Sequence, residues 1–146
     1  MAKQITQTYS DATIADRLRE HGINPTTQRV LITRLLFERC AHLSAEDVYR
    51  LVNANDQQVS KATVYNTLGL LVECGVIREV IADPNKVFYD PNTAPHYHLY
   101  DVVSGELTDI DAKDVRVSGL PALPENSVIE GVDVIVRLRP EKRPSR

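Results

Sequence analysis

Two histidines stand one residue apart in the segment Pro95-His96-Tyr97-His98, and this pair is the most direct sign of chemistry in the chain. In an extended segment, side chains two positions apart point to the same face, because the side-chain repeat of a strand is two residues. Two imidazoles on one face can bind a single metal ion. The chain has only four histidines, so the pairing is informative, although two exposed histidines beside a turn would give the same pattern.

The first half of the chain predicts four helices, from apolar residues that repeat every three or four positions and from capping residues at the helix starts. The clearest start signal is Ser44-Ala-Glu-Asp47, where the serine lies three residues before an acid, as in a capping box. Gly22 and Gly75 mark helix ends. The predicted helices span residues 10–21, 26–39, 44–54 and 61–74, with Ser60 as the cap of the last.

The rest of the chain predicts short strands. Two of them, 76–82 and 86–89, flank the turn Asp83-Pro84-Asn85, and with the helices they predict a winged helix-turn-helix. After a proline-containing linker, further strands are expected at 96–103, 106–111, 115–117 and 128–138. The predicted fold class is α+β. The expected domains are a DNA-binding domain (1–83), a hinge (84–95), a small, mostly β dimerisation and sensing domain (96–140) and a basic tail (141–146).

A sheet as small as the one expected after residue 96 has open edges and little core. Pairing with a second copy through that sheet would solve both problems. It would also present two helical domains with twofold symmetry. We therefore expect a homodimer, and the sequence leaves open whether dimers pair into tetramers.

Composition limits the function classes. The net charge of −3 and pI near 5.8 argue against a protein that coats nucleic acid non-specifically, but a specific binder needs only a local basic face. No apolar run is long enough to span a bilayer, and we expect a cytoplasmic protein with no membrane partner. Cys40 and Cys74 are expected to be reduced, buried thiols. No nucleophile and base stand at a recognised spacing, so an enzyme is not expected.

Three motifs carry a specific resemblance: Thr27-Gln-Arg29, Leu43-Ser-Ala-Glu-Asp-Val-Tyr49 and Ala62-Thr-Val-Tyr-Asn-Thr-Leu68. With them the chain resembles the ferric uptake regulator superfamily over nearly all of its first hundred residues. The resemblance implies a dimeric, metal-responsive transcription regulator with an N-terminal winged helix and a C-terminal α/β dimerisation domain.

The resemblance also implies a regulatory metal site. The family's ligand positions are a histidine before the S-A-E-D helix, a carboxylate after the wing, an H-x-H pair and a carboxylate on the next strand. In this chain they hold His42, Asp90, His96, His98 and Asp109. Three histidines and two carboxylates suit Fe²⁺ or Mn²⁺, and Zn²⁺ can also bind. Each residue has a structural alternative as well: a helix-junction cap for His42, a turn residue for Asp90 and a strand-end acid for Asp109.

Departures from the family pattern indicate a subgroup. Asp101 and Ser104 stand where many members carry the C-x-x-C of a structural zinc, so no Cys₄ zinc site is expected. The ending Gly131-Val-Asp-Val-Ile-Val-Arg-Leu-Arg139 is similar to the iron response regulator branch. In that branch the H-x-H region is associated with haem or iron sensing, so haem is a further candidate cofactor.

The fourth helix is expected to read the major groove of double-stranded DNA. Tyr65 can contact a thymine methyl group or a phosphate, and Asn66 can form a bidentate pair with adenine. An AT-rich, palindromic operator fits the resemblance and the asparagine. Other expected DNA contacts are Ser60, Lys61 and Thr63, with Arg17, Arg19 and Arg29 as weaker candidates. An internal salt bridge is an equal alternative for Arg29.

The sequence therefore predicts an iron- or manganese-responsive regulator of iron homeostasis genes. The first alternative is a peroxide sensor that uses the same five ligands, with Asp rather than Glu at position 109 and with His42 or His96 oxidised by iron chemistry. The second is a haem-binding or metal-buffering protein that does not bind DNA. The sequence does not decide whether metal switches DNA binding on or off.

Overall fold

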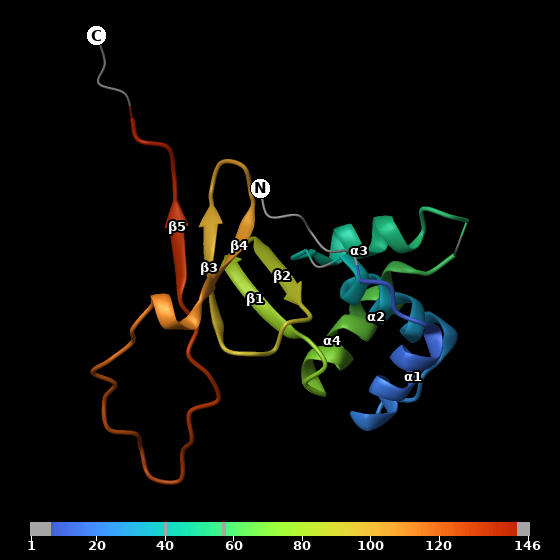
Figure 1. The fold of residues 1–146 in the computed structure, drawn as a ribbon, viewed down its shortest axis with the longest axis horizontal. Helices are drawn as coiled ribbons and strands as arrows, with labels where there is room; N and C mark the ends of the chain where they lie inside the picture. The colour runs from blue at the N-terminus through green and yellow to red at the C-terminus, as the bar shows by residue number, and fades with distance from the viewer. Residues whose placement is uncertain (1–6, 40, 57, 143–146) are drawn as a thin grey trace. The chain divides into compact units, whose positions relative to one another are not determined.

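The computed structural model describes residues 7–39, 41–56 and 58–142. The chain divides into two compact units, and it passes from one to the other between Thr93 and Ala94. The first unit contains four α-helices and a two-stranded sheet, and the second contains a three-stranded sheet (Figure 1). This content confirms the predicted α+β class, with a helical N-terminal domain and a β-rich C-terminal domain.

The helices of the first unit begin where the capping residues predict. The Ser10, Ser44 and Ser60 side chains each accept a hydrogen bond from the backbone N–H three residues later, at 3.1–3.2 Å. Asp47 returns a bond to the Ser44 N–H at 3.1 Å, which completes the capping box. The helices are α1 (Asp11–Glu20), α2 (Thr27–Arg39), α3 (Ala45–Val52) and α4 (Lys61–Glu73). Among the described residues, no helix is long and apolar enough to cross a membrane.

The core of the first unit forms around α2, which contacts α1, α3 and α4. Because it has neighbours on several sides, its buried residues do not follow a single stripe: they are Val30, Ile32, Thr33, Leu36 and Phe37. Buried residues of α1, α3 and α4 complete the core: Ile14, Leu18, Val48, Val64, Leu68 and Leu71. Cys74, which follows α4, is a half-buried free thiol, and Cys40 lies outside the described residues.

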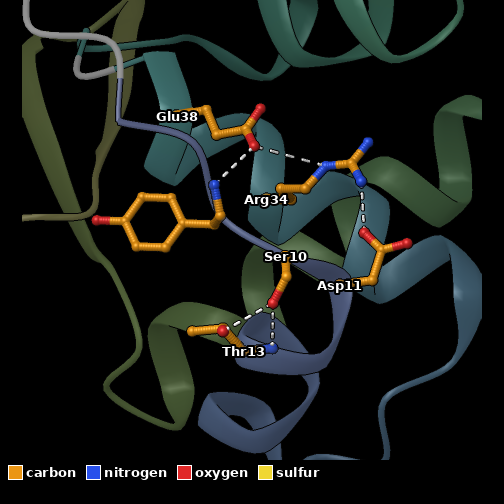
Figure 2. Close-up of polar contacts among 6 residues, drawn as sticks. Ser10, Asp11, Thr13, Arg34 and Glu38 are labelled. Atoms are coloured by element: carbon orange, nitrogen blue, oxygen red, sulfur yellow. Dashed lines mark hydrogen bonds and ion pairs between the residues drawn. The ribbon is translucent and has the colours of Figure 1, made fainter.

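Polar contacts join the start of α1 to α2. Figure 2 shows the Arg34 guanidinium between two acids: it pairs with Asp11, and its Nε atom lies 3.9 Å from Glu38 Oε1. The same Glu38 oxygen accepts the Tyr9 N–H at 3.0 Å. The Tyr9 ring packs edge-on against Phe37, with centroids 5.8 Å apart. These contacts attach the residues before α1 to α2.

Strands β1 (Arg78–Asp83) and β2 (Lys86–Asp90) form the antiparallel wing. Strand β2 lies within residues 84–95, the segment that the sequence assigns to a hinge. Its pairing with β1 makes it part of the wing. An additional antiparallel bridge joins Leu43 to Tyr89, and the Tyr89 N–H donates to the Leu43 carbonyl at 2.8 Å. This bridge ties the end of the wing to the residues just before α3.

The second unit is a sheet in the order β4-β3-β5, with β3 (His96–Asp101) in the middle. Strand β4 (Leu107–Asp111) runs antiparallel to it and β5 (Ile135–Leu138) runs parallel. One turn of 3₁₀ helix, η1 (Ala112–Asp114), follows β4. Burial alternates along β3: His96, His98 and Tyr100 are buried and the residues between them are half-buried.

Two strand predictions in this unit were wrong. Residues 115–117 form no strand, and of the long strand expected at 128–138 only Ile135–Leu138 is regular. The described segment 115–134 is a long loop that leaves the sheet and returns to it (Figure 1). Only four residues of β5 pair with β3, so the β-branched residues before them have no neighbouring strand in the described sheet. Strand propensity without a partner does not make a strand.

Candidate metal centre and nucleic-acid interface

Three of the predicted ligands lie together on the sheet of the second unit. His96 and His98 are two residues apart on β3, and Asp109 stands directly opposite His98 on β4. The Asp109 Oδ1 atom lies 3.4 Å from His98 Nε2 and 3.5 Å from His96 Nε2. One ligand atom from each residue lies within 4.8 Å of the others. The antiparallel register thus turns an H-x-H pair and an acid on the next strand into a cluster of three donors.

The separation of these donors suits a bound cation. Two atoms that each lie about 2.1 Å from a metal are about 3.0 Å apart in octahedral geometry and about 3.4 Å apart in tetrahedral geometry. The distances of 3.4 and 3.5 Å lie at the upper value. Both histidines are buried, whereas the Asp109 side chain is 48% exposed. The two strands therefore present a donor set that fits a divalent transition metal.

A backbone carbonyl orients the first of these rings. The Nδ1 atom of His96 lies 2.7 Å from the Ala94 carbonyl oxygen. A carbonyl only accepts hydrogen bonds, so Nδ1 of His96 must carry a proton, and in the neutral ring the lone pair is on Nε2. That is the nitrogen that faces Asp109. Metal-binding histidines are commonly oriented in this way, and sequence reasoning missed the part that Ala94 takes.

The other two predicted ligands lie in the first unit and are neighbours there. His42 Nε2 is 3.4 Å from Asp90 Oδ2. The bridge between Leu43 and Tyr89 explains this contact, because the residues on either side of an antiparallel bridge are also brought together. The second Asp90 oxygen, Oδ1, accepts the Asn92 N–H at 2.9 Å. This buried carboxylate thus has one oxygen used by the backbone and one directed at an imidazole.

The positions that replace the C-x-x-C form the turn between β3 and β4. Asp101 Oδ1 accepts the backbone N–H groups of Val103 and Ser104, at 2.9 and 3.0 Å. These hydrogen bonds hold the pKa of the Asp101 carboxyl below its usual value. The Ser104 hydroxyl in turn accepts the Glu106 N–H at 3.2 Å. Both residues have a local structural role in closing the hairpin.

The predicted DNA-reading residues of α4 lie on its outer side. Ser60, Lys61, Tyr65 and Asn66 are exposed and Thr63 is half-buried, whereas the core stripe of the same helix is fully buried. A shallow pocket of about 240 Å³ separates this surface from the start of α2. Its lining includes Thr63 and Asn66 of α4 and Arg29 of α2. The structure thus brings three of the predicted contacts to one hollow.

The three arginine candidates have different surroundings. The Arg29 guanidinium donates to the Asn24 carbonyl at 3.0 Å, a contact with the backbone instead of the salt bridge considered for it. Arg19 pairs with Asp16 on its own helix at 3.0 Å. The Arg17 guanidinium lies 5.0 Å from the centre of the Phe37 ring. Of the three, only Arg29 lines the hollow beside α4.

Sequence reasoning also missed Glu46. This residue lies in the first turn of α3, where its charge suits the helix dipole, and nothing in the motif indicates a partner on α4. In the structure its Oε1 atom is 2.9 Å from Lys61 Nζ and 3.5 Å from the Tyr65 hydroxyl. An acid thus touches two of the predicted DNA-reading side chains.

Comparison with known proteins identifies relatives of the same architecture. The peroxide-responsive repressor PerR of Staphylococcus aureus (strain Mu50 / ATCC 700699) is 32% identical over 92 residues, which are 63% of this chain and 62% of that protein. The chain thus matches less than two thirds of the length of this relative. The ferric uptake regulator from Pseudomonas aeruginosa, solved with manganese, superposes with a TM-score of 0.66 at 25% identity, over 87% of this chain and 97% of that one.

A second solved structure shares the fold at lower identity. The ferric uptake regulator of Vibrio cholerae superposes with a TM-score of 0.67 at 19% identity, over 86% of this chain and 98% of that one. The model of the ferric uptake regulator family matches residues 20–128, from the end of α1 to the loop before β5. That match includes every predicted metal ligand and the whole of α4, and it covers well over half of the chain. The protein therefore belongs to the ferric uptake regulator family.

Proposed function

We propose that this protein is a cytoplasmic, metal-responsive transcription regulator that binds a palindromic, AT-rich operator as a homodimer. The observation that carries the proposal is the cluster of His96, His98 and Asp109 in the second unit, whose donor spacing fits a divalent metal. Membership of the ferric uptake regulator family supports it, as does the exposed outer side of α4 in the first unit.

The regulatory metal is proposed to take five ligands. His96, His98 and Asp109 supply three from the second unit, and His42 and Asp90 supply two from the first. The linker between β2 and β3 is five residues long, so one ion with ligands from both units would restrict their relative orientation. The donor set suits Fe²⁺ or Mn²⁺, and cellular supply decides which ion is bound. Haem at the H-x-H pair is the alternative ligand.

The homodimer is proposed to form through the second unit. Strands β4 and β5 lie at the two edges of its sheet, and β5 exposes Val136 and Leu138. Unpaired edges and exposed apolar side chains are both covered when two copies associate. Twofold symmetry would then present two α4 helices to the two halves of a palindrome.

On the DNA, Tyr65 and Asn66 are proposed to contact bases, and Ser60, Lys61 and Thr63 are proposed to contact the backbone. Arg29 lines the same hollow as Thr63 and Asn66, and we add it to the backbone contacts. Arg17 and Arg19 remain weaker candidates, because neither lines the hollow that contains Thr63 and Asn66.

The test is operator binding measured side by side for the metal-free, Mn²⁺, Fe²⁺ and haem forms. We expect the affinity to differ at least about tenfold between the metal-free form and one loaded form, a typical coupling between two binding sites. Tyr65→Ala should lose operator binding and retain metal binding. The double variant His96→Ala/His98→Ala should have the DNA affinity of the metal-free form and should not respond to metal. If no AT-rich palindrome binds in any form, the proposed function is wrong.

Two versions of this function differ in the signal that the protein would sense and in the genes that it would regulate. Control of iron homeostasis is favoured by the chain ending Gly131–Arg139, which is similar to the iron response branch. Peroxide sensing is favoured by the similarity to the Staphylococcus aureus repressor and by an aspartate at position 109. Mass spectrometry of the iron-loaded protein after peroxide treatment distinguishes them. An added oxygen atom on His42 or His96 supports the peroxide sensor, and unmodified histidines exclude it.

A further inference from the structure

An acidic side chain contacts the DNA-reading helix within the first unit. Glu46, in the first turn of α3, places its Oε1 atom 2.9 Å from the Lys61 ammonium and 3.5 Å from the Tyr65 hydroxyl. The first contact is a charge-assisted hydrogen bond and the second is a long one. Lys61 and Tyr65 are two of the groups that the proposed function assigns to DNA.

The surroundings of Lys61 hold its charge toward this acid. The hydrogen bond to Glu46 and its negative charge raise the pKa of the Lys61 ammonium. The same ammonium lies 5.9 Å from the centre of the Tyr49 ring on α3. Glu46 and Tyr65 also line a hollow of about 480 Å³ between the start of α3 and the turn of the wing. The acid and the Tyr65 side chain thus share one hollow.

Folding stability does not explain the ion pair. The Glu46 side chain is 64% exposed and that of Lys61 is 58% exposed. Exposed ion pairs contribute little to the stability of a fold, because water screens both charges. Glu46 is also not a member of the capping box, which is formed by Ser44 and Asp47. The pair can therefore open at small cost when a stronger partner arrives.

We propose that Glu46 competes with DNA phosphate for the Lys61 ammonium and the Tyr65 hydroxyl, and so lowers the affinity for DNA of any sequence. This inference rests on the proposed function, and it identifies Glu46 as a side chain that limits the affinity for DNA. A phosphate oxygen is an acceptor of the same kind as a carboxylate oxygen, so the two anions would occupy the same donors. A phosphate that reaches Lys61 also meets the negative charge of Glu46 a few ångströms away.

The physical consequence concerns affinity and salt dependence. Each phosphate neutralised by a lysine adds about 0.9 to the slope of log affinity against log salt. A lysine paired with a carboxylate has no net charge to contribute, so Lys61 should count for less than one full contact. Phosphates carry no sequence information, and the effect should be equal on an operator and on a scrambled duplex. Discrimination between sequences is left to groups such as Asn66.

The experiment is a double-mutant cycle on DNA binding. Fluorescence anisotropy is measured with a labelled AT-rich palindrome and a scrambled duplex, at several salt concentrations, both without metal and with Mn²⁺. The proteins are wild type, Glu46→Gln, Lys61→Met and the double variant. Glu79→Gln is the matched control. Glu79 lines the same hollow from β1, and its replacement by glutamine removes the same negative charge.

We expect Glu46→Gln to bind both duplexes about two- to fivefold more tightly, with a steeper salt slope. In the Lys61→Met background the gain should fall toward that of Glu79→Gln, because only the Tyr65 hydroxyl is then left for Glu46 to compete for. Weaker binding by Glu46→Gln would overturn the inference, since the acid would then position Lys61 instead of competing for it. An undiminished gain without Lys61 would overturn it too, as a general charge effect. If wild type and every variant bind neither duplex, with or without Mn²⁺, the proposed function fails and the inference fails with it.

Discussion

Replacing Asp47 by asparagine removes the titrating half of the capping box at the start of α3. The Asp47 carboxylate accepts hydrogen bonds from the Ser44 N–H at 3.1 Å and from Arg50 Nη2 at 3.2 Å. Burial acts to raise the pKa of Asp47, but the backbone and side-chain hydrogen bonds with Ser44 and the Arg50 charge together outweigh it and lower the pKa below 3.8. Helix α3 has only eight residues, so its first turn is a large part of it.

The sign of the pH dependence follows from this lowered pKa. A carboxyl with a lower pKa in the folded state contributes stability that is fully present above its unfolded pKa and is lost as pH falls through the folded pKa. For Asp47 the contribution is complete above pH 3.8 and declines below it. We expect Asp47→Asn to lower the free energy of unfolding by about 1 kcal/mol at pH 7. For a unit of this size that is a fall of roughly 4–8 °C in Tm.

The assay is urea unfolding of the metal-free protein between pH 7 and pH 3, followed by circular dichroism at helical wavelengths. The α-helices that the structure describes all lie between residues 11 and 73, so this signal reports on the first unit. Ser10→Ala is the control, because Ser10 caps α1 at 3.1 Å and has Thr13 in place of the acid. It should cost about 1 kcal/mol at every pH. A difference between wild type and Asp47→Asn that is as large at pH 3 as at pH 7 would refute the reasoning.

Three further predictions concern the core, the DNA surface and the metal. Leu68 is fully buried on α4, so Leu68→Ala should lower the free energy of unfolding by about 2–5 kcal/mol in the urea assay. Asn66→Ala should reduce discrimination against a changed adenine by about 1–3 kcal/mol in competition binding, and an unchanged preference would remove Asn66 from base reading. Asp109→Asn should weaken Mn²⁺ binding at least about tenfold by calorimetry, whereas Asp111→Asn, on the same strand and opposite His96, should change it little.

The helix starts could be predicted from the sequence because caps are local. Ser10, Ser44 and Ser60 each bond a backbone group three residues later, so the signal and its effect lie within one turn. The same reason explains why the alternation of β3 was predictable, since it follows from the pleat of a single strand.

Features that depend on distant neighbours could not be predicted with the same success. The buried residues of α2 include Ile32, Thr33 and Phe37, because three other helices surround it and no single stripe describes its burial. Strand β5 is shorter than its β-branched sequence indicates, because a strand ends where its partner ends. The contact of Glu46 with α4 depends on how two helices cross, and capping patterns carry no information about that.

The candidate metal site divides in the same way. The sequence alone determined the donor types and placed His96 and His98 on one face, since side chains in a strand repeat every two residues. Family resemblance added His42, Asp90 and Asp109. Only the tertiary structure decided that Asp109, and not Asp111, faces both imidazoles, and that a bridge between Leu43 and Tyr89 brings His42 to Asp90. Register and bridging depend on backbone pairing between segments far apart in the chain, and no local pattern specifies that pairing.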